Sequence, residues 1–100
     1  MIVHLSVEAE RDLEWIGDYI ARDNPERAIS FLQELRAKCL GLADHPHAFP
    51  LVPRYETQGV RRRVHGNYLI FYRVQAESLT VIHILHGAMD YAGILFSPDS

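Results

Sequence analysis

The dipeptide Asn24-Pro25 divides the first half of the chain into two helices that must fold back on each other. The residue before a proline avoids the helical conformation, asparagine is a favourable N-cap, and proline suits the first position of a helix. A helix is therefore predicted to begin at Pro25. Its apolar stripe consists of Ala28, Phe31, Leu32, Leu35, Cys39 and Leu42. Because only two or three residues separate it from the helix before, the two helices form a hairpin.

The preceding helix has its own start signal. Ser6 stands where an N-cap belongs, and Glu8 and Glu10 follow in the first turn, where acidic groups are favourable. The apolar stripe of this helix consists of Ala9, Leu13, Ile16 and Ile20. The apolar stripes of the two helices need a third surface against which both can pack. Residues 2–5, three of which are apolar, are predicted to form a strand just before the helix.

The second half of the chain is predicted to be β-structure. Strands are expected at Val60–His65, Tyr68–Val74 and Leu79–His86, with turns at Gly66-Asn67 and at residues 75–78. Residues 44–59 contain three prolines, and their apolar residues follow no helical or strand period. We expect an ordered surface loop there. The element order β-α-α-β-β-β predicts an α+β domain with the helical hairpin on one face of a small, largely antiparallel sheet. The other face is left for the loop, the tail or a partner.

Length and composition indicate one soluble domain. A chain of 100 residues, 48% hydrophobic and 23% charged, suits a single folded domain over residues 1–100. The lone cysteine, Cys39, excludes an intrachain disulfide and favours a reducing cytoplasm. The sequence shows neither a signal peptide nor an apolar run of the ~20 residues that span a bilayer. The tail, residues 91–100, carries Ile94, Leu95 and Phe96, which we expect to dock on this domain or on a partner.

Arginine is concentrated in the second half, where Arg54, Arg61, Arg62, Arg63 and Arg73 are the only bases. Side chains alternate along a strand, so Arg61 and Arg63 are predicted to share one face and Arg62 the other. They are either solvated charges that protect an edge strand or a face that recognises anions, which Arg73 could join.

No catalytic, metal-binding or cofactor-binding set is predicted. His83 and His86 are three residues apart on a predicted strand and should face opposite sides, so they cannot chelate one ion. Cys39 falls in the apolar stripe of the second helix and is interpreted as a buried hydrophobe. The glycines form no phosphate-binding motif.

Six segments, taken together and in order, resemble the ParE branch of the ParE/RelE toxin superfamily over about residues 5–91. They are residues 9–20, Asn24-Pro25 with Ala28 and Phe31-Leu32, residues 42–46, Gly59-Val60-Arg61, residues 68–73 and residues 84–90. The family's fold has the same element order. Two positions depart from the family pattern, because Ala48-Phe49 stands where glycine is frequent and Met89 where arginine is frequent.

The resemblance implies the toxin of a type II toxin–antitoxin system, associated with growth inhibition and plasmid stabilisation. A ParE-like toxin binds DNA gyrase and traps it on cleaved DNA, so it inhibits by binding and is not an enzyme. A ParD-like antitoxin, a ribbon-helix-helix protein with a flexible C-terminal segment, neutralises the toxin in a hetero-oligomer. The toxin meets DNA only indirectly, through that antitoxin.

The residues expected to contact the antitoxin or the target are Arg61, Arg63, Arg73, His83, His86, Asp90 and Tyr91. An acidic, amphipathic antitoxin segment would lie on the uncovered sheet face and the arginines. The alternative is a RelE-like toxin that cuts messenger RNA on the ribosome, for which His86, Tyr91 and the arginines supply the residue types of acid–base catalysis.

Overall fold

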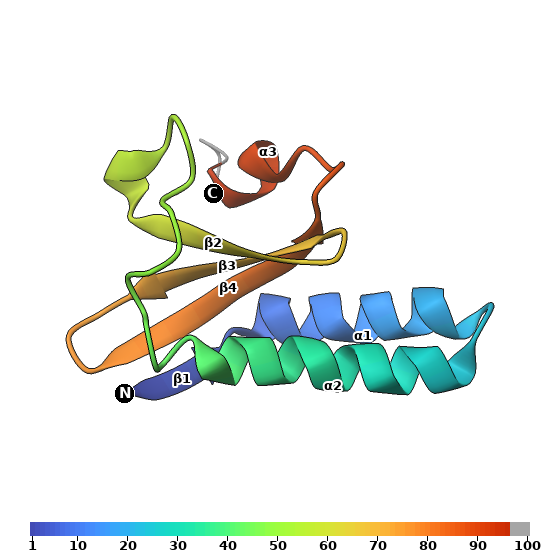
Figure 1. Ribbon diagram of the computed structural model, residues 1–100. Coiled ribbons are helices and arrows are strands. Elements are labelled where there is room, and N and C mark those ends of the chain that lie inside the picture. Colours follow the sequence, from blue (N-terminus) through green and yellow to red (C-terminus); the bar gives the residue numbers. More distant parts are fainter. Residues whose placement is uncertain (97–100) are drawn as a thin grey trace.

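A computed structural model describes residues 1–96 and contains the predicted elements in the predicted order (Figure 1). The elements are β1 (Ile2–Leu5), α1 (Val7–Ala21), α2 (Pro25–Gly41), the 3₁₀ turn η1 (Glu56–Gln58), β2 (Val60–His65), β3 (Tyr68–Val74), β4 (Ser78–His86) and α3 (Tyr91–Leu95). The strands form one sheet in the order β1-β4-β3-β2. β1 runs parallel to β4 and the other pairs are antiparallel, so the sheet is largely antiparallel as predicted.

The helix boundaries follow the expected caps. The Ser6 side chain accepts a hydrogen bond from the Ala9 amide, and the Asn24 side chain accepts one from the Arg27 amide. β4 begins at Ser78, one residue before the predicted start, because the turn closes with the Gln75 amide donating to the Ser78 carbonyl.

The helical hairpin covers one face of the sheet and forms the larger core (Figure 1). Buried side chains from the two helical stripes meet those of the strands, among them Leu13, Leu35, Ile70, Tyr72 and Val81. The helices approach closely at Gly17, where a Cβ atom would lie 2.8 Å from Cδ1 of Leu32.

The opposite face of the sheet is covered by the chain itself, which corrects the expectation that it stays open. The loop and α3 lie on this side in Figure 1. Their side chains Val52, Tyr55, Tyr91, Leu95 and Phe96 pack with Val60, Leu69, Phe71 and Leu85 in a second core. Burial of these apolar groups holds the loop and the start of the tail on the domain. The part of the tail beyond residue 96 lies outside the described residues.

Cys39 is buried within the larger core, as the sequence stripe predicted. Burial raises the pKa of its thiol to about 11. Since the thiolate is the reactive form, we expect the folded chain at pH 8 to react with a thiol reagent such as DTNB far more slowly than the chain unfolded in guanidinium. Equal rates in the two states would contradict this expectation.

Candidate partner-binding groove

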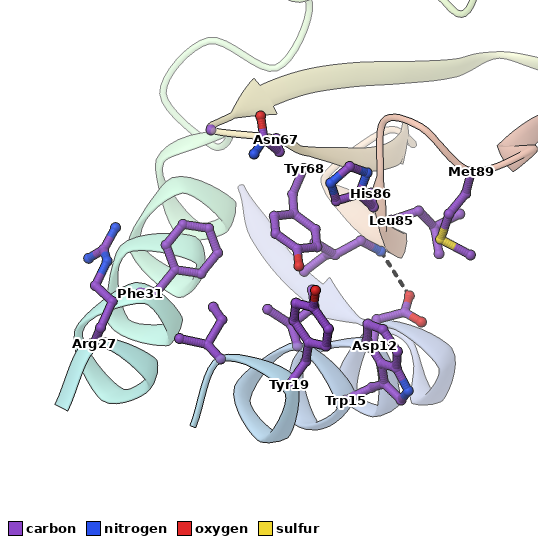
Figure 2. A pocket seen from close by; sticks show the side chains of 14 residues that line it. Asp12, Trp15, Tyr19, Arg27, Phe31, Asn67, Tyr68, Leu85, His86 and Met89 are labelled. Carbon is purple, nitrogen blue, oxygen red and sulfur yellow. Dashed lines mark hydrogen bonds between the residues drawn. The ribbon is translucent and has the colours of Figure 1, made fainter. Parts of the chain in front are cut away.

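A groove with a volume of about 830 Å³ opens between α1 and the sheet (Figure 2). Its walls come from the second half of α1, the first turns of α2, the β2–β3 turn and the end of β4. The lining is mainly apolar and aromatic, and its larger side chains are Trp15, Tyr19, Phe31, Tyr68, His86 and Met89. None of the helices within residues 1–96 is long and apolar enough to cross a membrane.

Two aromatic layers face the groove. On α1, Trp15 and Tyr19 stack with ring centroids 5.5 Å apart and an interplanar angle of 7°. They are 61% and 53% exposed. Across the groove, the Tyr68 ring meets Phe31 at 5.6 Å and His86 edge-on at 5.3 Å (Figure 2). Exposed aromatic surface of this kind is typical of sites that bind a ligand or another polypeptide.

The charged groups at the rim are already paired within the chain. The Arg27 guanidinium lies 5.0 Å from the centre of the Phe31 ring and forms a salt bridge with Glu34. Glu34 also lies 3.0 Å from Nε2 of His65. Hydrogen bonds from Arg27 and then from His65 lower the pKa of the Glu34 carboxyl. The groove therefore offers a partner mostly apolar surface with neutralised charge at its edge.

Asp12 connects α1 to the end of β4 inside the groove. Its Oδ2 accepts hydrogen bonds from the Ile84 amide at 2.8 Å and from Nδ1 of His83 at 2.7 Å. The register between β3 and β4 shifts beside Phe71 and Tyr72, with Tyr72 opposite Val81 and Phe71 opposite His83. This β-bulge adds one residue to β4 and breaks the alternation of its side chains.

His83 pairs directly with Phe71 of the second core and His86 with Tyr68 of the larger core, so the pairing places the two histidines on opposite sides of the sheet, as predicted. The bulge lies on the other side of His83, between His83 and Val81, and His83 still contacts Asp12 of α1 through Nδ1. No local pattern in residues 78–86 indicates the bulge. Within residues 1–96, no three His, Cys, Asp or Glu side chains group as metal ligands would.

The arginines of β2 secure the long loop to the domain. Arg61 and Arg63 share one face of the sheet, as predicted, and this is the face that the helices cover. Nη1 of Arg61 donates to the carbonyl oxygens of His47 at 3.3 Å and Phe49 at 2.8 Å. Nη1 of Arg63 donates to the Lys38 carbonyl at 3.1 Å, and its guanidinium lies 4.7 Å from the centre of the Phe49 ring. Arg61 thus supplies donors to loop carbonyls, and Arg63 supplies one to a carbonyl in the last turn of α2.

Arg73 does not join Arg61 and Arg63, which corrects the expected arginine face. It pairs directly with Val60, and directly paired residues share a side of the sheet. Since Val60 belongs to the second core, Arg73 lies on the loop side, where its Nε donates to the Gln58 carbonyl at 3.2 Å.

Asp90 and Tyr91 also lie apart from the groove. Asp90 caps α3 by accepting a hydrogen bond from the Gly93 amide. The Tyr91 ring packs on Phe71 at 5.1 Å, and its hydroxyl accepts a hydrogen bond from Nη1 of Arg62 at 2.9 Å. Of the residues expected to contact a partner, only His86 lines the groove. The sequence does contain one signal for this site. Trp15 and Tyr19 are aromatic but lie outside the apolar stripe of α1, which predicts that they are exposed.

The loop is also held by Tyr72, whose buried hydroxyl donates to the Pro46 carbonyl at 2.8 Å. Replacing Tyr72 with phenylalanine should lower the free energy of unfolding by about 1 kcal/mol, because the carbonyl loses its donor. Urea denaturation followed by circular dichroism measures the change. Tyr55→Phe is the matched control, since within residues 1–96 its hydroxyl makes no side-chain hydrogen bond. Equal losses in the two variants would contradict the role of the Tyr72 hydroxyl.

The fold and the groove define a class: a small α+β domain with a helical hairpin on one face of a mixed sheet and an exposed aromatic groove suited to binding another polypeptide. The family model described as ParE toxin of the type II toxin–antitoxin system parDE matches residues 3–91. The chain therefore belongs to the ParE toxin family.

Solved structures share the fold. One is a chain of the chromosomal ParDE TA system from P. aeruginosa, with a TM-score of 0.69 and 22% identity, covering 86% of this chain and 95% of that one. Another belongs to the toxin–antitoxin complex RelBE2 from Mycobacterium tuberculosis, with a TM-score of 0.63 and 23% identity, covering 85% and 95%. The comparison with curated proteins found no match.

Proposed function

We propose that this ParE-family toxin arrests growth by binding DNA gyrase, and that a ParD-like antitoxin neutralises it by inserting apolar side chains into the aromatic groove. The observation that supports antitoxin binding there is the exposure of Trp15 and Tyr19 opposite Tyr68 and His86. Gyrase as the target is the proposal that follows from family membership.

A binding role is favoured over RelE-like cleavage of messenger RNA by the positions of the candidate catalytic groups. His86 lies on the helix-covered side of the sheet, whereas Tyr91 and Arg62 lie on the loop side. An acid and a base that act on one phosphodiester must reach the same atoms. The sheet separates these two groups.

The gyrase proposal is tested with the purified chain, freed of antitoxin, incubated with gyrase and supercoiled plasmid. We expect cleaved DNA covalently linked to gyrase to accumulate, and addition of the antitoxin to suppress it. The chain unfolded by heat serves as the control. Absence of cleaved DNA, together with new transcript ends in cells that express the chain, would favour the RelE-like alternative.

The antitoxin proposal is tested by co-expressing the chain with the product of a short neighbouring reading frame that encodes a ribbon-helix-helix protein. Trp15 is the single tryptophan of the chain, so its fluorescence reports directly on the groove. We expect a stable complex and a shift of the Trp15 emission towards shorter wavelengths. A complex with unchanged Trp15 emission would place the antitoxin elsewhere on the surface.

A further inference from the structure

A second, smaller pocket lies at the other end of α2 from the aromatic groove and shares no lining residue with it. It has a volume of about 380 Å³ and opens where the last turn of α2, the start of the long loop and β2 meet. Figure 1 shows the loop leaving the end of α2 at this place. We call it the loop pocket, and its charged and ionisable lining residues are Lys38, Asp44, His45 and Arg63.

The guanidinium of Arg63 is held in the loop pocket with one edge unused. Its Nη1 donates to the Lys38 carbonyl at 3.1 Å, and the planar group lies 4.7 Å from the centre of the Phe49 ring. These two contacts fix its orientation. Within residues 1–96, Nε and Nη2 of Arg63 make no hydrogen bond. These two nitrogens form one edge of the guanidinium, and such an edge binds an oxyanion through two parallel hydrogen bonds.

The charges around the loop pocket favour an anion. Lys38 and Arg63 are half-buried, and neither forms a salt bridge within residues 1–96. Asp44 is the single acid among the lining residues, and it is exposed and also outside every salt bridge of that part of the chain. Partly buried charges are screened less by salt than exposed ones. The two cations therefore attract an anion into the pocket.

The remaining lining is apolar and comes from Ala37, Ala48 and Phe49, with Gly41 between α2 and Arg63. A Cβ atom at Gly41 would lie 3.5 Å from Nη1 of Arg63, so the glycine keeps space open beside the guanidinium. Sites for small organic molecules have volumes of roughly 300–1,000 Å³, and the loop pocket reaches that range. It therefore suits an anion that carries an organic group rather than a bare inorganic ion.

We propose that the loop pocket binds an organic phosphate monoester of about the size of a mononucleotide. A phosphate monoester carries a charge of about −1.5 to −2 at pH 7 and three acceptor oxygens. Two oxygens can accept from the free edge of Arg63 and the third from the Lys38 ammonium. A carboxylate has one charge and two oxygens, so it satisfies the arginine edge but neutralises only one of the two cations. The apolar lining then contacts the organic group.

This site goes beyond the proposed function, because it involves neither the aromatic groove nor gyrase. The phosphate monoester has two sources, which are a free nucleotide and the 5′-phosphate end of a nucleic acid. In either case the ligand connects α2, residues 44–49 and β2, which are distant in sequence. A ligand that binds only the folded chain stabilises it by mass action.

Titration of the chain with adenosine 5′-monophosphate, followed by amide NMR spectra, tests the proposal. We expect saturable shifts of the Gly41, Asp44 and Ala48 amide signals and a melting temperature that rises with ligand concentration. Adenosine alone and inorganic phosphate alone should each bind roughly tenfold or more weakly, because each occupies one end of the pocket. Absence of saturable shifts at these amides, or equal affinity for inorganic phosphate and the nucleotide, would overturn the proposal.

A DNA tetranucleotide with and without a 5′-phosphate distinguishes the two sources. If it binds more tightly than adenosine 5′-monophosphate only when phosphorylated, the ligand is a nucleic-acid end. If it binds more weakly than the mononucleotide, the ligand is a free nucleotide. Equal binding of the two tetranucleotides at the Gly41 and Ala48 amides would show attraction of phosphodiesters by surface charge, which contradicts a monoester site.

Ala48→Asp and Ala76→Asp are a matched pair of variants that test the position of the site. Both alanines are exposed, so neither change removes buried packing, but Ala48 lines the loop pocket and Ala76 lies between β3 and β4. A carboxylate at position 48 competes with the phosphate for Arg63 and Lys38, so affinity for adenosine 5′-monophosphate should fall roughly tenfold or more. The change at position 76 should alter it by less than about twofold. Equal losses in the two variants would mean that net charge, not the loop pocket, attracts the ligand.

Discussion

Replacing Asp12 with alanine is expected to lower the free energy of unfolding by about 3 kcal/mol. One carboxylate oxygen accepts both the Ile84 amide and the His83 ring, in a site where the Asp12 side chain is only 19% exposed. Hydrogen bonds to a charged acceptor contribute about 1.5–3 kcal/mol each. The variant leaves the Ile84 amide at the β-bulge without an acceptor, which adds the cost of burying an unpaired donor.

Urea denaturation measures this loss. The slope of the unfolding free energy against urea concentration should be the same in the variant and in the unaltered chain. Asp12→Asn keeps an oxygen acceptor without the charge and should lose about 1 kcal/mol. Glu14→Ala, at an exposed position of the same helix, should change stability by less than about 0.5 kcal/mol. If Asp12→Ala is no more destabilising than Glu14→Ala, the link between α1 and the bulge does not stabilise the fold.

Replacing Trp15 with alanine should weaken antitoxin binding roughly 30-fold or more, about 2 kcal/mol, while the free chain keeps its stability. Large aromatic residues that become buried in an interface are frequent binding hot spots. Trp15 is mostly exposed in the free chain, so its removal takes little from the core. Isothermal titration calorimetry measures the affinity, since this variant lacks the fluorescent reporter.

Ile29→Ala is the matched control for Trp15→Ala. Ile29 is 63% exposed, close to the 61% of Trp15, but it lies on α2 outside the groove. Its replacement should leave the affinity within about twofold. If both variants weaken antitoxin binding equally, or if Trp15→Ala does not weaken it, the groove is not part of the antitoxin interface.

Local sequence signals determined the elements of this protein and most of their boundaries. The Ser6 and Asn24 caps, Pro25 and the Gly66-Asn67 turn each act within a few residues, so their effects can be read without knowledge of the fold. The apolar stripes likewise gave the buried faces of both helices, including Cys39.

The candidate site depended on contacts between distant residues. Asp12 and His83 are 71 residues apart, and their contact lies at a bulge that changes which way the end of β4 faces. The arginine pattern correctly placed Arg61 and Arg63 together, yet Arg61 bonds to the Phe49 carbonyl of a loop that no periodicity could position, and Arg63 bonds to the Lys38 carbonyl at the end of a distant helix.

The sequence by itself determined an α+β domain with a helical hairpin on a largely antiparallel sheet, and its motifs indicated the family. Only the tertiary structure decided that the loop and residues 91–96 cover the far face of the sheet, and that Trp15 and Tyr19 meet Tyr68 and His86 across a groove. The physical reason is range: caps, turns and periodicity act over a few neighbouring residues, whereas a groove exists only where packing brings distant segments together.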